Sequence, residues 1–293
     1  MKIGILGDIH VRIDHANQIL ALMGDCDKII FQNDIFDQFT DSVDDNIKAA
    51  IWLKQKLEDD KNIFLLSNHL ISYQFPWNSY ARCSGFTLEK SKAINQILTQ
   101  EDWHKQYSFY VYEDILFTHA GLSKRFLDDM VRIGKIDEFE YTLENIIPIL
   151  EKWTEKAYAN YRINHGHPLF AAGYNRGGAQ ETGGIIWADL GEFETIPGIL
   201  QIFGHSPLKS PTFKFTRKDK QAYAIVDDKK TNWLEISQYL KNGFGLDLDT
   251  HLHHYAVLEN KELSIFEVIY NCVWSPGVKN HVIGKKFIRK FNL

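Results

Sequence analysis

Polar side chains that can bind metal follow the first apolar segment of the chain. Residues 3–6 are apolar, the run ends at Gly7, and Asp8 and His10 follow at once. This pattern predicts a buried strand that ends in a tight turn. Side chains two positions apart on an extended segment point the same way, so Asp8 and His10 can hold one metal ion together. Taken alone, the pair also fits an ordinary turn with a capping aspartate.

Two further segments repeat this arrangement. The short apolar segment 28–32 leads into Asp34. The segment 63–66 leads into Asn68. Helical patterns lie between the segments, so the first third of the chain predicts successive β–α units. Because parallel strands bring their carboxyl ends together at one edge of a sheet, the three polar groups are expected at one site.

Two histidines extend this set. His119 follows a predicted strand at 115–118, and His205 follows one at 200–203. Oxygen and imidazole ligands without thiolates suit manganese, iron, zinc or magnesium rather than a structural zinc. Six ligands exceed what one ion with an open position needs, and they suit two ions about 3.5–4 Å apart that share a carboxylate. The candidate ligands are Asp8, His10, Asp34, Asn68, His119 and His205.

Such a site fits the hydrolysis of a phosphate ester. A pair of ions polarises a phosphoryl oxygen, supplies hydroxide near neutral pH and holds both oxygens of an in-line displacement. The departing alcohol then needs a proton. His69, next to Asn68, can donate that proton, and Asp37 can orient and charge the imidazole.

Composition excludes several other classes of protein. The chain has 293 residues, of which 44% are apolar and 24% charged, enough for one large core or two modest domains. Its net charge of −5 argues against a strongly basic nucleic-acid-binding protein, although the net charge does not exclude local basic patches. Three cysteines without a CxxC pair favour a reducing compartment. The apolar runs are too short for a signal peptide or a membrane span, so we expect a cytoplasmic protein without a membrane partner.

The polar groups form an ordered series of short motifs. In chain order they are Gly7-Asp8-Ile9-His10, Asp34-x-x-Asp37, Asn68-His69, His119-Ala120-Gly121 and Gly204-His205. The series resembles the calcineurin-like metallophosphoesterase superfamily. The fourth motif, and a last motif without Gly-His-x-His, resemble its PPP-type branch, which includes serine/threonine protein phosphatases and symmetrical bis(nucleosyl)tetraphosphatases.

The resemblance implies a fold and a domain plan. The fold would be α/β (α+β): a two-sheet β-sandwich flanked by helices, with the site at the strand ends. One metallophosphoesterase domain would cover residues 1–270, with a helical and loop insert at about 122–184 and an insertion at about 209–245. Residues 271–293 would form a basic C-terminal tail on the surface.

The resemblance also implies the roles of the site residues. Two divalent ions would share Asp34, with manganese as the expected metal and iron, zinc, magnesium or nickel as alternatives. The first ion would be bound by Asp8, His10 and Asp34, and the second by Asp34, Asn68, His119 and His205. His69 and Asp37 would form the acid pair.

The chain departs from the family pattern in the turns beside the ligands. Asn33 and Ser67 each replace a glycine, and Leu70 replaces an acidic residue. Asparagine tolerates unusual φ, so the turn at Asn33 is expected to survive. Gln38 stands where protein phosphatases carry an arginine that binds the substrate phosphate. Arg176, in a glycine-rich loop, is a candidate substitute, and a solvated loop arginine is the alternative.

Three functions fit these residues. The first is a dinuclear metal-dependent phosphomonoesterase, most similar to a serine/threonine protein phosphatase and acting on a phosphoprotein. The second is hydrolysis of a nucleotide pyrophosphate or dinucleoside tetraphosphate, because the aromatic stretch 73–80 can stack a nucleobase and Gln38 removes an arginine. The third is a catalytically weak module that keeps the metal site as a scaffold.

Overall fold

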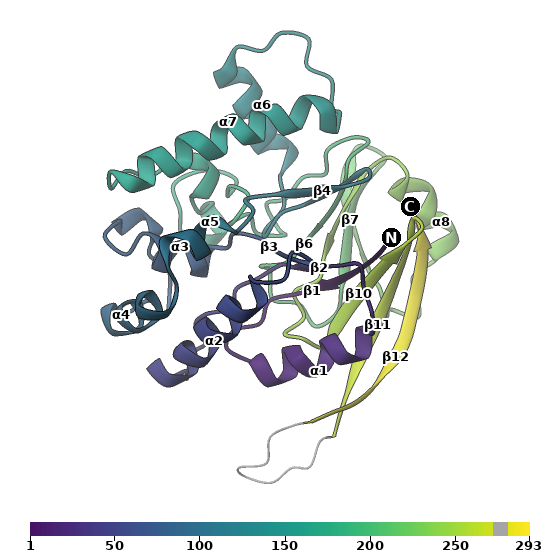
Figure 1. The fold of residues 1–293 in the computed structure, drawn as a ribbon. Helices are drawn as coiled ribbons and strands as arrows, with labels where there is room; N and C mark the ends of the chain where they lie inside the picture. Colours follow the sequence, from purple (N-terminus) through teal and green to yellow (C-terminus); the bar gives the residue numbers. More distant parts are fainter. Residues whose placement is uncertain (272–280) are drawn as a thin grey trace.

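Two β-sheets pack face to face between layers of helices in the computed structural model, which describes residues 1–271 and 281–293 (Figure 1). Within the described residues, each sheet has six strands. The order in the first sheet is β12 (His281–Asn292), β11 (Glu262–Asn271), β10 (His254–Glu259), β1 (Lys2–Leu6), β2 (Lys28–Phe31) and β3 (Asn62–Phe64). The order in the second is β4 (Tyr110–Tyr112), β5 (Ile115–Phe117), β6 (Leu200–Phe203), β9 (Phe244–Asp247), β7 (Thr212–Arg217) and β8 (Lys220–Ile225). The prediction of a two-sheet sandwich flanked by helices is confirmed.

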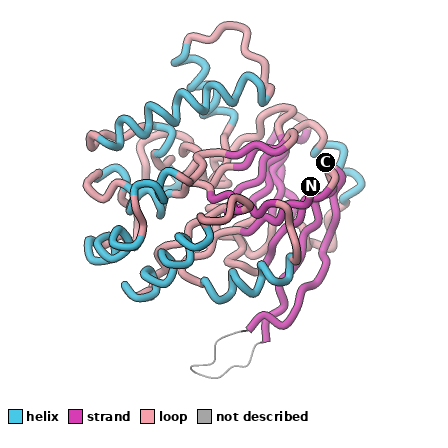
Figure 2. The backbone as a smooth tube through the Cα atoms, in the orientation of Figure 1, coloured by secondary structure: helices cyan, strands magenta, loops and turns pink. Residues whose placement is uncertain are grey.

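Most helices lie on the left of the view, and the strands gather on the right (Figure 2). Helices α1 (Ile13–Met23), α2 (Val43–Lys56), α4 (Leu88–Ile97) and α5 (Gln100–His104) share a core with the outer face of the first sheet. Helices α3 (Asn68–Gln74), α6 (Lys124–Gly134) and α7 (Leu143–Arg162) share another core beside the second sheet. Helix α8 (Trp233–Leu240) packs at the edge of the core between the sheets. None of the described helices combines the length and apolarity that a membrane span requires.

Alternation along β1 explains how one strand serves two cores. Ile3 and Ile5 are fully buried in the core between the sheets, whereas Leu6 faces the helical layer. Gly4 lets α1 approach, because a Cβ there would lie 2.8 Å from the sulfur of Met23. Strand β1 is therefore held on both faces, which fixes the loop at its carboxyl end.

Sequence patterns located the strands that precede the candidate ligands but misread a later segment. The segment expected as an insertion at about 209–245 contains α8, and it also contributes the β7–β8 hairpin to the second sheet. Phe213 and Phe215 are buried at alternate positions of a strand. The charged residues of this segment obscured that pattern in the sequence.

The basic C-terminal tail is a correction. We expected residues 271–293 to be a surface segment; residues 272–280 lie outside the described part, but β12 pairs antiparallel with β11. The lysines that suggested a solvated tail face acidic partners across the strand pair: Lys286 lies 3.2 Å from Glu267, and Lys290 lies 2.7 Å from Glu262. The segment is a strand because it pairs along its length with β11 and buries Phe291, which the tail's basic composition does not reveal.

Loss of a β12 anchor should destabilise the protein. Phe291 is 8% exposed, and its ring centroid lies 4.8 Å from that of Phe213 and 5.1 Å from that of Trp233. Phe291→Ala should therefore lower the free energy of unfolding by about 3 kcal/mol. Urea titration measures this change, with Phe287→Ala on the same strand as the control because Phe287 is 54% exposed. Equal stability of the two variants would show that β12 is not part of the core.

Candidate metal centre

The candidate ligands lie in loops that follow the carboxyl ends of strands. In the first sheet β1, β2 and β3 run parallel, and in the second β5, β6 and β9 run parallel. Because the two sheets are stacked, the loops of both reach the same edge of the sandwich. The first sheet supplies Asp8, His10, Asp34 and Asn68, and the second supplies His119 and His205.

Four candidate ligand atoms lie close together, and one of them is His119 Nε2. This nitrogen lies 2.9 Å from Asn68 Oδ1, 3.2 Å from His205 Nδ1 and 3.5 Å from Asp34 Oδ2. The other ring nitrogen lies 2.7 Å from the carbonyl of Gln32. A carbonyl only accepts, so Nδ1 carries the proton and Nε2 presents a lone pair to the other three residues. Lone pairs that face one another in this way suit a cation between them.

A second group meets at the same aspartate. His10 Nδ1 donates to the carbonyl of Asp37 at 2.7 Å, so its Nε2 is free to face Asp34 Oδ2, at 3.9 Å. His69 Nε2 lies 4.0 Å from the same oxygen. Two of the possible metal-binding groups among the described residues are thus His10–Asp34–His69 and Asp34–His119–His205, and both contain Asp34.

Asp8 lies between these groups. Its Oδ2 accepts a hydrogen bond from the backbone N–H of His205 at 3.1 Å, and its Oδ1 lies 3.7 Å from His119 Nδ1. The structure therefore brings together the ends of the predicted ligand series, which are almost 200 residues apart in the chain. All six predicted ligands lie in one contiguous cluster.

The pKa shifts and unpartnered polar atoms of these residues indicate whether they suit a cation. Burial, followed by the carboxylates of Asp249 and Asp34, raises the pKa of Asp8 well above its usual range. Burial and the adjacent His119 ring lower the pKa of His205 well below its usual range. Within the described residues, Asp8 Oδ1 and His205 Nε2 are buried without a hydrogen-bond partner. Crowded carboxylates and neutral imidazoles with unused lone pairs are what divalent metals bind, so the residues fit a metal centre.

The backbone at the centre is bent in an unusual way. Positive φ angles occur at Asn33 (97°), Asp34 (41°), His10 (46°) and His205 (77°). Non-glycine residues rarely adopt this region, and such strain gathers at functional sites. The expectation that Asn33 would tolerate the turn agrees with its φ, and its side-chain amide donates to the carbonyl of Leu65.

His69 and Asp37 form an ion pair next to the ligands. His69 Nδ1 lies 2.9 Å from Asp37 Oδ2, while Asp37 Oδ1 accepts from Tyr73 at 2.6 Å and from Lys90 at 3.0 Å. Burial alone would lower the pKa of His69, but the carboxylate of Asp34, followed by Cys83 and the hydrogen bond to Asp37, outweighs it and raises the pKa well above its usual range. Asp37 therefore holds Nδ1 of His69, and Nε2 is directed toward the metal-binding groups.

Arg176 lies at the rim of this cluster. Its Nη2 donates to the carbonyl of His205 at 3.3 Å, and its Nε lies 2.8 Å from Asp189 Oδ2. Arg12, in contrast, donates to the backbone carbonyls of Asp8, Ile9 and His251 and so shapes the first loop. Of these two arginines, Arg176 is the one whose side chain reaches the second-sheet side of the centre.

Sequence patterns missed three residues of this region. Asp249 follows parallel strand β9, so its position after a strand end was a usable signal. Lys90 on α4 and Cys83 in the preceding loop carried no such signal, because only the packing of that loop against Asp37 places them here.

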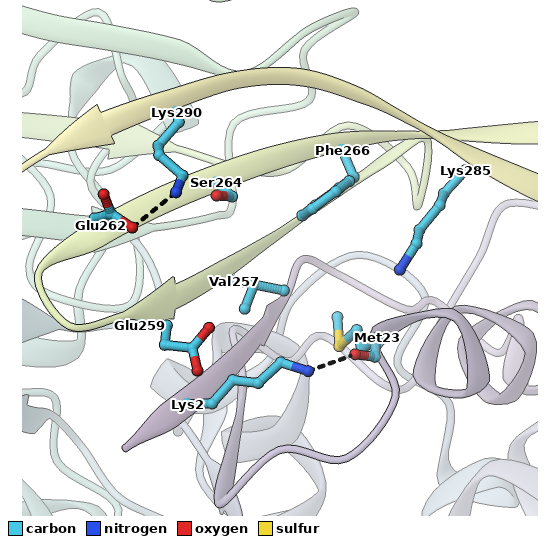
Figure 3. Close-up of a pocket in the computed structure, with 9 residues that line it drawn as sticks. All are labelled: Lys2, Met23, Val257, Glu259, Glu262, Ser264, Phe266, Lys285 and Lys290. Carbon is cyan, nitrogen blue, oxygen red and sulfur yellow. Dashed lines mark hydrogen bonds and ion pairs between the residues drawn. The ribbon is translucent and has the colours of Figure 1, made fainter.

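A separate small pocket lies at the other end of β1 (Figure 3). Lys2 and Glu259 line it, and Lys290 is paired with Glu262 inside it. Its volume is about 170 Å³. The pocket lies at the amino end of β1, so it is not part of the metal centre.

Comparisons with known proteins give distant likenesses. No protein-family model and no curated protein matches the chain. Among solved structures it is similar to a metallophosphoesterase from Sphaerobacter thermophilus, with 13% identity, a TM-score of 0.41, and coverage of 88% of this chain and 83% of that one. It is also similar to a cold-active protein-tyrosine phosphatase of a psychrophilic Shewanella species, with 13% identity, a TM-score of 0.47, and coverage of 98% and 80%. Both TM-scores are below 0.5, so neither likeness carries an argument about this chain.

Proposed function

We propose that the chain is a metal-dependent phosphoesterase that hydrolyses phosphate monoesters at a centre of two divalent ions. The observation that carries this proposal is the position of Asp34, which belongs to two candidate ligand groups at once. A shared carboxylate is the usual link between two ions in hydrolytic centres. Asp8, His10 and Asp34 would hold one ion, and Asp34, Asn68, His119 and His205 the other, with manganese as the proposed metal.

The chain's own residues would orient the substrate and supply a proton. Two bound ions provide Lewis acidity and an activated water for in-line displacement. His69 would donate its Nε2 proton to the departing alcohol. Asp37 holds the opposite ring nitrogen, and Tyr73 and Lys90 hold Asp37, so the acid has a fixed orientation. Preorganisation of this kind spares the site from reordering during the reaction.

We assign the substrate phosphate to the side of the centre that Arg176 borders. Its guanidinium is oriented by Asp189 and contacts the loop that carries His205. Guanidinium groups bind phosphate oxygens through paired hydrogen bonds. Gln38, at the position where protein phosphatases carry an arginine, is exposed, so Arg176 would take over this role.

Removal of metal should abolish turnover. Protein treated with a chelator and desalted should lose at least about a hundredfold of its activity on p-nitrophenyl phosphate, because metal centres contribute several kcal/mol to such reactions. Added Mn²⁺ should restore the activity at two equivalents per chain, measured by metal analysis and a colorimetric assay. Full turnover in metal-free protein would exclude the proposal.

A substrate panel would separate the finer alternatives. We propose a serine/threonine phosphoprotein as the natural substrate. Trp77 and Tyr80 are 51% and 64% exposed, which supports dinucleoside tetraphosphate as the second candidate, because exposed rings can stack on a base. Turnover of a phosphopeptide and of a dinucleoside tetraphosphate, measured side by side, decides between them. Two bound ions without turnover of either would favour the scaffold module.

A further inference from the structure

A thiol joins the acid pair in a cluster of its own. Cys83 Sγ lies 3.4 Å from His69 Nδ1, which lies 2.9 Å from Asp37 Oδ2. The ligand atoms of the three residues all lie within 4.8 Å of one another. The cluster uses Nδ1 of His69, whereas the opposite nitrogen, Nε2, faces Asp34. The two ring nitrogens therefore belong to different sites.

The spacing of these atoms fits a tetrahedral zinc ion. Zinc binds sulfur at about 2.3 Å and nitrogen or oxygen at about 2.0–2.2 Å. Tetrahedral angles at those lengths separate sulfur from nitrogen by about 3.6 Å and nitrogen from oxygen by about 3.4 Å. The observed separations of 3.4 Å and 2.9 Å are slightly shorter, so the side chains need only small outward shifts. A thiolate ligand favours zinc over the harder manganese and magnesium ions.

The loop that carries Cys83 is fixed in place. Ser72 Oγ on α3 donates to the carbonyl of Ala81 at 2.7 Å and lies 3.2 Å from Cys83 Sγ. Gly85 has a φ of +88°, and a Cβ there would lie 2.7 Å from the Cβ of Asp37. Only glycine allows this loop to lie directly on Asp37. The thiol is therefore presented to the acid pair by packing rather than by chance contact.

Asp37 keeps one carboxylate oxygen for this cluster. Tyr73 and Lys90 occupy Oδ1 of Asp37 and leave Oδ2 for His69 and a metal. The side chains of Asp37 and His69 are 2% and 12% exposed, while Cys83 is half-buried. A water can complete the coordination from the side of Cys83.

We propose that Asp37, His69 and Cys83 form a separate zinc site that inhibits the enzyme. Binding replaces the proton on Cys83 Sγ and the proton on His69 Nδ1 with bonds to zinc, and both protons pass to solvent. Zinc thereby separates His69 from Asp37. The His69 ring then no longer has the orientation in which Asp37 holds it for proton donation. Zinc binding stands on geometry alone, whereas inhibition rests on the proposed function of His69.

Cobalt and zinc test the two parts separately. Addition of Co²⁺ to protein already loaded with manganese should produce a thiolate-to-cobalt charge-transfer band in wild type and in Cys26→Ser, and no band in Cys83→Ser. Zinc should also protect Cys83, but not Cys26, from alkylation, as measured by peptide mass spectrometry. Cys83→Ser should keep its manganese-dependent activity, because serine preserves the size of this half-buried side chain.

Inhibition is measured on an alkyl phosphate such as glycerol 2-phosphate, whose leaving group needs the proton. The zinc concentration that halves turnover should rise at least about tenfold in Cys83→Ser, since even indirect partners change metal affinity on that scale. Exchange of zinc into the Asp34 centre would affect wild type and variant equally. A cobalt band that persists in Cys83→Ser overturns the site. A Cys83-dependent band without zinc inhibition supports the site and counts against the proposed role of His69.

Discussion

Asp34→Asn should reduce turnover by about a thousandfold or more. The substitution keeps the shape of the side chain and removes the negative charge that both candidate ligand groups share. A loss of this size corresponds to about 4 kcal/mol of transition-state stabilisation, which is in the range that metal centres supply. Metal analysis should show fewer than two tightly bound ions, because an amide is a weaker ligand than a carboxylate.

The matched control for this variant is Asp44→Asn. Asp44 lies in the first turn of α2, is exposed, and lies outside the candidate metal groups. It should keep two ions and wild-type turnover, so any effect of Asp34→Asn beyond a general change of charge is specific to the centre. If Asp34→Asn still bound two ions and turned over at the wild-type rate, the shared-carboxylate centre would be wrong.

His69→Asn should slow hydrolysis according to how much the leaving group needs a proton. On an alkyl phosphate kcat should fall by about 10²–10⁴, the usual contribution of a general acid. On p-nitrophenyl phosphate the loss should be far smaller, because nitrophenolate leaves without protonation. The comparison of kcat values for the two substrates in one variant separates acid catalysis from damage to the site as a whole.

Metal content distinguishes the two roles open to His69. Its Nε2 lies 4.0 Å from Asp34 Oδ2, so the residue also belongs to a candidate ligand group with His10. As an acid, it can be replaced without loss of either ion. As a ligand, its replacement should release one. His165→Asn serves as the control, because His165 is an exposed loop histidine. An equal loss of kcat on both substrates, together with a missing ion, would reassign His69 as a ligand.

The sequence by itself predicted which polar side chains lie together in the folded protein. Each ligand follows a short apolar run, and the parallel β–α order predicted by the first three runs brings their carboxyl ends together. This reasoning needed only local patterns, because strand ends and polar residues are both visible in the sequence. It also explains why Asp8 and His205 could be predicted to lie together although they are 197 residues apart in the chain.

Tertiary structure decided the rest. The pairing of β12 with β11 depends on a partner strand and on the packing of Phe291 against Phe213 and Trp233, so a basic tail could not be recognised as a strand from its own composition. The placement of Lys90 and Cys83 beside Asp37 depends on a loop that fits only because Gly85 has no side chain. Local periodicity records which face of an element is buried, but it holds no information about which distant residue will pack there. The acid pair could therefore be predicted from the sequence, whereas the thiol next to it became visible only in the folded protein.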